Sequence, residues 1–221
     1  GDFVARDLSL SVGYDYNIPW SDFYVGANVK FLSSKIENFT SQWLSTDIGV
    51  YYFSDYRPYS FTAVIRNLGY QITPYEEVRE EIAYDIAIGA SFLMSDVPIK
   101  WHLTMNSLQQ WNLAVPNPSN SNTDLDGNTE EESISFLDNM MRHFVIGVEL
   151  FPESKFNLRF GYNFRRAAEL KLAEARTFAG LSAGFGLKMG RFKFDYAFTK
   201  YHPVDNSSTF TLYIDLTRKG F

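Results

Sequence analysis

The polar stretch between 115 and 138 is the part of the chain closest to a metal-binding loop. Asn122, Asp124 and Asp126 alternate before Gly127, and this resembles the spacing with which an EF-hand loop presents oxygen ligands to calcium. The match is incomplete, because the first position is asparagine and Ser133 stands where a bidentate glutamate would close the ligand shell. We therefore expect a solvated acidic loop here, with calcium binding as the alternative.

The residues that most often carry catalysis are scattered or missing. His102, His143 and His202 have no ligand-like spacing around them, and the chain contains no cysteine. The nucleophile-elbow, zinc-protease and phosphate-loop motifs do not occur in the sequence. We therefore predict a protein that is not an enzyme and that has no metal centre and no cofactor.

Charged residues instead recur at alternate positions inside apolar runs, and both signs occur at similar depths along these runs. Charges that are removed from water must be paired, so we predict a network of ion pairs on one face of a sheet. A path for a solute is the alternative. The residues assigned to this network are Lys30, Asp47, Arg66, Asp85, Lys100, Glu149, Arg159, Lys188 and Asp195, and Asp15, His102 and Lys193 share their alternation.

The elements that must position these charges are β-strands, because apolar and polar residues alternate with a period of two. The runs 156–165, 179–189 and 192–199 interleave aromatic or aliphatic residues with glycine, serine or charged residues. A strand sends successive side chains to opposite faces, so each run has one apolar and one polar face. The apolar face is the core in a soluble sandwich and the outside in a transmembrane barrel.

Composition narrows the class of protein. Of the 221 residues, 45% are hydrophobic and 17% aromatic. No stretch approaches 18 consecutive apolar residues, so we expect no transmembrane helix. The net charge of −6 is unlike the basic surface of a nucleic-acid-binding protein. An outer-membrane barrel is compatible with these observations, because each of its strands carries only a weak hydrophobic signal.

We expect eleven strands and no helix with a sustained 3.6-residue period. The one helix-compatible stretch, 166–175, is short and charged, and we place it in a loop. Most of the strands reach about ten residues, which fits tilted membrane-spanning strands. The expected spans are 4–16, 22–34, 44–53, 59–68, 81–94, 98–112, 140–151, 155–165, 176–189, 191–201 and 208–217.

Short and long connections alternate between these strands, and the short ones contain the glycine, proline, aspartate and serine of tight turns. Such alternation is typical of an outer-membrane barrel with short periplasmic turns and longer extracellular loops. The predicted fold is therefore all-β, an antiparallel transmembrane β-barrel whose charged face lines the lumen. The short connections are 17–21, 54–58, 95–98, 152–154 and 189–191, and the long ones are 35–43, 69–80, 113–139, 166–175 and 202–207.

The number of strands predicts that the barrel continues upstream of Gly1. The last strand runs toward the short-turn side, so eleven strands place the start of the first strand on the extracellular side. Single-chain bacterial barrels have an even number of strands, and their termini normally share the periplasmic side. We therefore treat residues 1–221 as one barrel domain and expect an odd number of strands, most simply three, before it.

Six segments together give the chain a family resemblance. They are 47–52 (DIGVYY), 63–70 (AVIRNLGY), 103–113 (LTMNSLQQWNL), 163–170 (NFRRAAEL), 180–188 and 194–197 (FDYA). These segments resemble the PorV/PorQ family of outer-membrane proteins of the type IX secretion system, and they cover nearly the whole chain. The Arg-Arg-x-x-Glu-Leu stretch and the segment 67–72 (NLGYQI) make the PorQ branch the closer match.

The resemblance implies a FadL-like barrel of fourteen strands, eleven of them in this chain, in the outer membrane of a Gram-negative bacterium of the Bacteroidota. It implies a non-enzymatic role in which a PorQ-like barrel anchors partners of the surface attachment complex. These partners would be similar to PorZ, PorU and PorV, and the complex joins secreted cargo to lipopolysaccharide. Outer-membrane lipid and lipopolysaccharide are expected as further partners, and nucleic acid is not.

Three other functions stay open. The chain could be a PorV-like shuttle that binds the C-terminal domains of cargo proteins, a FadL-like transporter of hydrophobic small molecules, or a soluble β-protein. A transporter needs an apolar interior pocket, and the charged faces count against one. For the anchoring role we expect the loops to carry the contacts, with 113–139 as the long extracellular loop. The candidate contact residues are Tyr70, Tyr75, Asp124, Asp126, Glu130 and Glu131.

Overall fold

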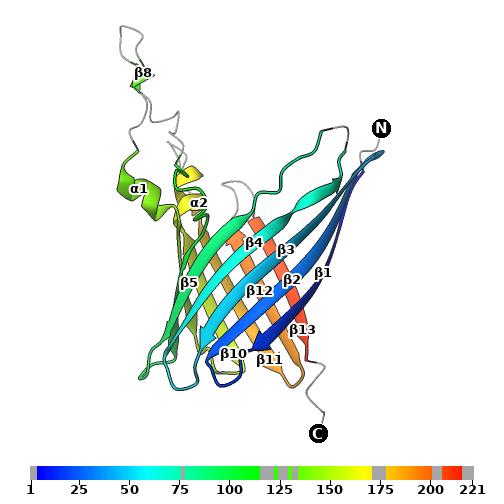
Figure 1. The fold of residues 1–221 in the computed structure, drawn as a ribbon. Coiled ribbons are helices and arrows are strands. Elements are labelled where there is room, and N and C mark those ends of the chain that lie inside the picture. The colour runs from blue at the N-terminus through cyan, green and yellow to red at the C-terminus, as the bar shows by residue number, and fades with distance from the viewer. Residues whose placement is uncertain are drawn as a thin grey trace. The chain divides into compact units, whose positions relative to one another are not determined.

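The computed structural model describes residues 4–75, 78–114, 122–123, 129–130, 134–170, 178–200 and 206–215. Over these residues, eleven antiparallel strands form one sheet and follow one another in chain order (Figure 1). They are β1 (Ala5–Asn17), β2 (Phe23–Ile36), β3 (Phe39–Phe53), β4 (Tyr59–Thr73), β5 (Asp85–Leu93), β6 (Ile99–Met105), β9 (Phe144–Leu150), β10 (Phe156–Asn163), β11 (Leu181–Met189), β12 (Phe192–Lys200) and β13 (Asn206–Ile214).

The predicted all-β class and the eleven strands of the sheet are confirmed over this part of the chain. A separate two-stranded sheet pairs β7 (Asn122–Thr123) with β8 (Thr129–Glu130). None of the described helices combines the length and the apolar character needed to cross a membrane.

The chain divides into two compact units. The first unit comprises residues 1–89 and 107–109, and the second comprises residues 90–106 and 110–221. Strands β1 to β4 belong to the first unit, and β6 and β9 to β13 belong to the second. Strand β5 begins in the first unit and ends in the second.

In the first unit, strand register sorts the side chains of β1 to β4 onto two faces. Val25 pairs with Val50, whereas the neighbouring Gly26 pairs with Gly49, and the alternation continues along both strands. Val25 and Val50 are exposed and belong to the apolar face. The opposite side, which we call the first polar face, carries Asp15, Gly26, Asn28, Lys30, Asp47 and Gly49.

In the second unit, β6 and β9 to β12 show the same separation. Phe160 pairs with Val148 and Ala183 on an apolar face, and its side chain is exposed. The residues next to it pair on the other side of the strands. This side, the second polar face, carries Lys100, His102, Glu149, Asn157, Arg159, Gly186, Lys193 and Asp195.

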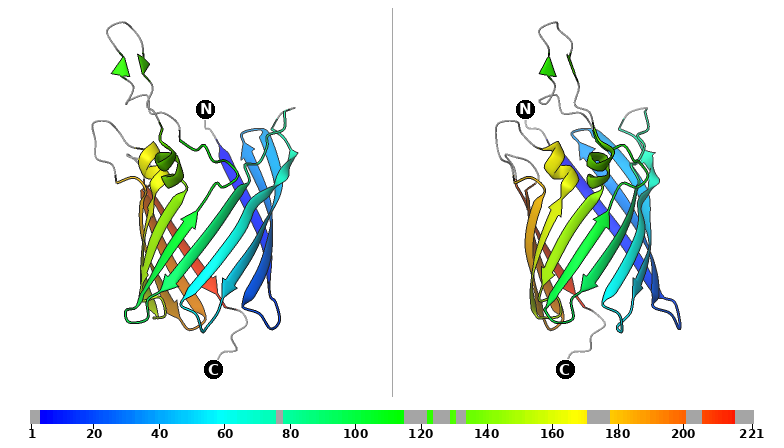
Figure 2. Two further views of the ribbon diagram at one scale, coloured as in Figure 1. Left: turned by 60° about the vertical axis from the view of Figure 1, so that its left-hand side comes forward. Right: turned by 90° about the vertical axis from the view of Figure 1, so that its left-hand side faces the viewer.

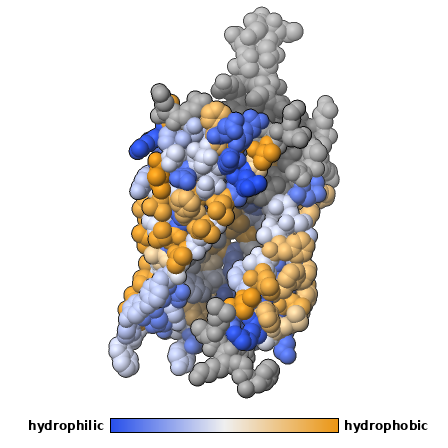
Figure 3. Space-filling model, turned by 90° about the vertical axis from the view of Figure 1, so that its right-hand side faces the viewer, coloured by the Kyte–Doolittle hydropathy of each residue, from blue (hydrophilic) through white to orange (hydrophobic). Residues whose placement is uncertain are grey.

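The described residues contain almost no buried apolar side chains. Only Ala87, Leu113 and Ala179 are both hydrophobic and buried, while large apolar residues along the strands are exposed. Figure 3 shows hydrophobic side chains gathered along the middle of the strands on the side it displays, with hydrophilic ones toward their ends. An ordinary soluble sheet buries its apolar face, and these strands do not.

The prediction of a long loop at 35–43 is wrong. In place of a loop at 35–43, β2 and β3 stay paired as far as Ile36 and Phe39, and a two-residue turn joins them. Glu37 in this turn has a φ of 51°. The polar residues that suggested a loop belong to the start of β3, where pairing with β2 outweighs their weak preference for strands. Strand β4 likewise extends to Thr73, beyond the expected end at 68.

Two six-residue helices were not expected: α1 (Phe136–Met141) and α2 (Phe164–Glu169). Each begins with a side-chain cap. Ser135 Oγ accepts a hydrogen bond from Asp138 N at 3.1 Å, and Asn163 Oδ1 accepts one from Arg166 N at 2.9 Å. Helices of little more than one turn are too short to give a periodic signal. Both lie at the same end of the strands of the second unit (Figure 2).

Candidate functional site

An ion pair on the first polar face joins three neighbouring strands. Lys30 Nζ lies 2.7 Å from Asp47 Oδ1 and donates a hydrogen bond of 2.6 Å to Asn67 Oδ1. Asp47 Oδ1 also accepts a hydrogen bond of 2.8 Å from the backbone N–H of Asn67. The register of β3 and β4 shifts beside Asp47, and Asn67 has a φ of 58°. Two of the segments behind the family resemblance therefore meet here to hold a β-bulge.

A second ion pair in the first unit fixes a loop to the sheet. Arg66 donates from Nη2 at 2.6 Å and from Nε at 3.1 Å to Asp85 Oδ2. The other oxygen of Asp85 accepts a hydrogen bond of 2.8 Å from Ser107 N. Gln109 Oε1 accepts a bond of 2.9 Å from Ile86 N in the same region. Residues 107–109 are thus held against the start of β5 by side chains and backbone together.

On the second polar face, one guanidinium lies between two carboxylates. Arg159 Nε is 3.1 Å from Glu149 Oε1, and Arg159 Nη1 is 3.1 Å from Asp195 Oδ1. Lys193 Nζ lies 3.0 Å from the other oxygen of Asp195, and His102 Nε2 lies 3.7 Å from Glu149 Oε2. The two carboxylates are only 15% and 13% exposed. The five side chains form one connected network across four strands.

Glycines make room for this network. A Cβ atom built on Gly186 would lie 2.5 Å from Asn157 Oδ1 and 2.6 Å from Asp195 Oδ1. One built on Gly161 would lie 2.7 Å from Ser182 Oγ. In the structure, the space beside Gly161 and Gly186 is taken by polar side chains of the neighbouring strands.

Lys100 and Lys188 stand apart from the other residues of the predicted network. Lys100 is opposite Glu149 in the register, but no ion pair joins them among the described residues. Lys188 is exposed and lies opposite Lys193, so two like charges face each other there. The remaining residues assigned to the network, Lys30, Asp47, Arg66, Asp85, Glu149, Arg159 and Asp195, form the ion pairs described above.

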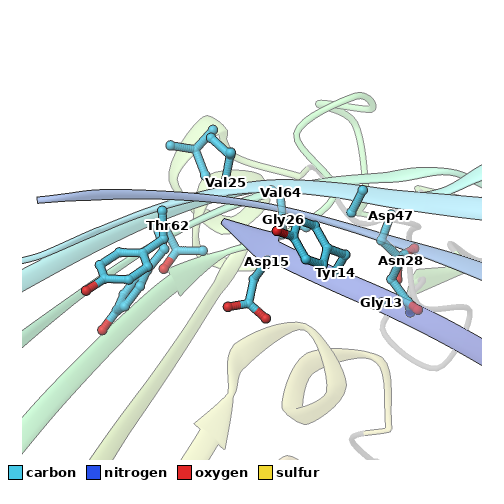
Figure 4. Close-up of a pocket in the computed structure, with 14 residues that line it drawn as sticks. Gly13, Tyr14, Asp15, Val25, Gly26, Asn28, Asp47, Thr62 and Val64 are labelled. Carbon is cyan, nitrogen blue, oxygen red and sulfur yellow. The ribbon is translucent and has the colours of Figure 1, made fainter. Parts of the chain in front are cut away.

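The first polar face also contains an open pocket with a volume of about 610 Å³. Gly13, Gly26 and Gly49 from three adjacent strands contribute to its lining, with Tyr24 and Tyr51 beside them. Figure 4 shows Asp15 and Thr62 on the side of the strands away from Val25. This pocket was not predicted from the sequence, although glycines at polar-face positions of successive strands are a signal that could have indicated it.

The segment after β6 is a structured part of the loop region rather than the strand expected up to residue 112. His143, 1% exposed, contacts the carbonyl oxygens of Asn106 at 2.7 Å and Trp111 at 3.0 Å. Asn139 Oδ1 accepts hydrogen bonds from Leu113 N at 2.9 Å and from Ala114 N at 3.0 Å. Two buried polar side chains next to or within α1 therefore fix this segment.

Exposed aromatic residues lie on the segment after β6 and on α1. The rings of Trp111 and Phe136 are 5.6 Å apart, and their residues are 41% and 69% exposed. Leu137, the next residue of α1, is 59% exposed. We call Trp111, Phe136 and Leu137 the loop shelf.

The predicted partner-binding residues are spread over several environments. Tyr70 is not in a loop, because it lies in β4 opposite Leu44, where it is 60% exposed. Tyr75 follows β4 and is half-buried. Glu130 is part of β8, where its backbone pairs with Asn122. Asp124, Asp126 and Glu131 lie outside the described residues, as does most of the calcium-like loop.

Among the residues that the structure describes, no group of three or more histidine, aspartate or glutamate side chains is arranged to hold a metal ion. His143 has both ring nitrogens directed at backbone carbonyls. Neither the known protein families nor the curated proteins contain a match to this sequence.

Proposed function

We propose that this chain is most of a fourteen-stranded, FadL-like β-barrel of a bacterial outer membrane. We further propose that it serves type IX secretion as a PorQ-like, non-enzymatic anchor for surface partners resembling PorZ, PorU and PorV. The observation that carries the membrane assignment is the exposure of the apolar faces. Phe61, Trp101 and Phe160 lie on three different strands and are 50%, 50% and 48% exposed.

The energetics favour lipid as the medium for these faces. Apolar surface in water costs about 25 cal/mol per Å², and soluble monomers rarely expose large contiguous apolar patches. A barrel in lipid also satisfies its backbone hydrogen bonds between strands, as the long ladders of β1 to β4 do here. Three further strands would complete an even number, as in single-chain bacterial barrels.

The paired charges support a polar inner surface. Each carboxylate of the Arg159 network, and Asp47 and Asp85 in the first unit, has a cationic partner within 3.1 Å. Paired charges of this kind stiffen a wall rather than carry out a reaction. An inner surface of this kind favours a scaffold that displays its loops.

The docking role is supported by the family resemblance and by the architecture of the loops. Residues 111–114 are fixed to α1 by buried His143 and Asn139, and Trp111 and α1 present the exposed loop shelf. A partner that covers rigid aromatic side chains loses little conformational entropy, which is why such residues often dominate protein interfaces. We place the main contact with the surface partners on this shelf.

The test is co-purification from native membranes. The tagged full-length protein should bring down surface proteins of the attachment complex, identified by mass spectrometry. The double variant Phe136→Ser/Leu137→Ser should reduce their recovery at least fivefold, because it removes the exposed apolar side chains of the shelf.

Lys200→Ser, a change in a strand of the same unit, is the matched control and should leave recovery unchanged. Recovery of the partners at wild-type level with the double variant would refute the placement on the shelf. A membrane-extracted protein that brings down no surface protein at all would refute the anchoring role.

A further inference from the structure

Three glycines of the first polar face could each accept a Cβ atom without a close contact. A Cβ atom built on Gly13, Gly26 or Gly49 would lie no closer than 3.4, 3.6 and 3.4 Å to any neighbouring atom. These are ordinary van der Waals distances, so each position would accept a Cβ atom without displacing a neighbouring side chain. The pocket of about 610 Å³ opens over them, and it falls within the usual size of small-molecule sites.

The walls of this pocket combine aromatic rings with one carboxylate. Tyr24 and Tyr51 are paired across β2 and β3 on the polar face, and their ring centroids are 6.2 Å apart. Asp15 is directly opposite Gly26 in the register of β1 and β2. Both kinds of group can therefore contact one molecule resting on the glycines.

The charge of the pocket is negative. Asp47 and Asp15 both contribute to the lining, and the described lining residues include no lysine or arginine. Asp47 is neutralised by Lys30 at 2.7 Å. Within the part of the chain that the structure describes, the Asp15 carboxylate has no ion-pair or hydrogen-bond partner, and Asp15 is exposed. One carboxylate is thus left to recognise a ligand.

We propose that the pocket on the first polar face binds an organic cation with an apolar or aromatic body. The apolar body would rest on the glycine floor beside Tyr24 and Tyr51. The cationic group would pair with Asp15, assisted by the faces of the tyrosine rings, which attract cations. This inference concerns only the first polar face and stands separately from the proposed anchoring role.

The experiment measures binding of 4-phenylbutyltrimethylammonium to the full chain in nanodiscs of zwitterionic lipid by isothermal titration calorimetry. 4-Phenylbutyrate is the comparison ligand, because it carries a similar body with the opposite charge. We expect the cation to bind at least tenfold more tightly than the anion. Asp15→Asn should weaken the cation about tenfold, and Gly26→Leu should abolish its binding by filling the pocket.

Asp7→Asn is the matched control. Asp7 lies on the same face of the same strand, but its carboxylate is already bonded to Ser34 Oγ at 2.5 Å, so its loss should leave cation affinity unchanged. Gly49→Leu repeats the filling test from the neighbouring strand, should Gly26→Leu fail to fold. Equal binding of the two ligands, no binding of the cation, or cation binding that survives both Asp15→Asn and the filling variants would overturn the proposal.

Discussion

Both polar faces have glycines within their strands, but the space above these glycines is filled on one face and open on the other. On the second polar face, Asn157 and Asp195 lie over Gly186, close enough to meet any added Cβ atom. On the first polar face, the space above Gly26 and Gly49 stays open and becomes a pocket. A glycine in a strand therefore does not by itself indicate a ligand. The space above a glycine is available to a ligand only if the side chains of adjacent strands do not reach across it.

The difference follows from the side chains that neighbour each glycine. Gly186 is opposite Asn157 on one side and Asp195 on the other, and both side chains extend over it. Asp195 continues to Arg159, with which it forms an ion pair. Gly26 is opposite Asp15 and Gly49. Two adjacent glycines and an unpaired carboxylate leave nothing to close the space. The second polar face is thus filled by its own side chains, whereas the first leaves room for a ligand.

The largest effect is expected from Phe160→Arg, which tests whether the apolar face of β10 meets lipid. Phe160 lies on the apolar face of β10 and is 48% exposed. If this face meets lipid, the arginine should lower the free energy of unfolding by about 2–4 kcal/mol near the bilayer midplane. Thr209→Arg, on the polar side of β13 opposite Ala197, should change it far less. Urea titration of the protein folded in lipid vesicles measures both.

Arg159→Met tests the network of the second polar face. The change removes one cationic neighbour from Glu149 and one from Asp195. We expect the free energy of unfolding to fall by about 2 kcal/mol. This is less than for a fully buried pair, because the arginine is 39% exposed. Lys100→Met is the control, since Lys100 forms no ion pair among the described residues. Equal effects of the two changes in denaturant titration would show that the network adds no stability.

Gly186→Val tests whether the glycine floor of the second face is filled. The new side chain must displace Asn157 and Asp195, so we expect a loss of about 1.5 kcal/mol in the free energy of unfolding. A double-mutant cycle with Asp195→Asn sharpens the result. The cost of the valine should shrink when the network has already been weakened. A valine tolerated without cost would mean that the space is open here as well.

Asn67→Ala tests how the ion pair of the first face is anchored. Asn67 has a positive φ and accepts a hydrogen bond from Lys30, so we expect a loss of about 1 kcal/mol in the free energy of unfolding. Asn67→Gly relieves the backbone strain and isolates the hydrogen bond, and it should cost less. If glycine proves as destabilising as alanine, the bulge does not depend on backbone conformation at this position.

Gly49→Val should have the smallest effect of the series. Its Cβ atom would meet neighbours at ordinary distances, and valine suits a strand, so the free energy of unfolding should stay within about 0.5 kcal/mol of wild type. Gly49→Val should therefore lower the free energy of unfolding by less than Gly186→Val does. Similar destabilisation at both positions would remove the distinction between an open and a filled floor.

Much of the fold could be predicted because strands have a period of two. Alternating residues such as those around Phe160 indicated the strands and their two faces, and charges at polar-face positions such as Arg159 indicated ion pairs. The sequence did not indicate which charges would pair. Arg159 and Asp195 are 36 positions apart, and they meet only because the register of β10, β11 and β12 aligns them.

The other differences between the predicted and the observed fold also come from tertiary pairing or from very short elements. The turn at Glu37 and the position of Tyr70 inside β4 reflect ladders that continue through polar residues. Helix α1 depends on the caps and buried contacts of Ser135 and Asn139 rather than on periodicity. The pocket combines Gly13, Gly26 and Gly49 from three strands, so no local window of the sequence contains it.

A site-specific quenching measurement can show directly which face of the strands meets lipid. Because the chain has no cysteine, Phe160→Cys and Thr209→Cys can each carry a single environment-sensitive fluorophore in lipid vesicles. Nitroxide-labelled lipids should quench the label at 160 while aqueous iodide does not, and the label at 209 should show the reverse. Quenching of the label at 160 by iodide, with no effect of the lipid nitroxides, would show that the apolar face of β10 does not meet lipid.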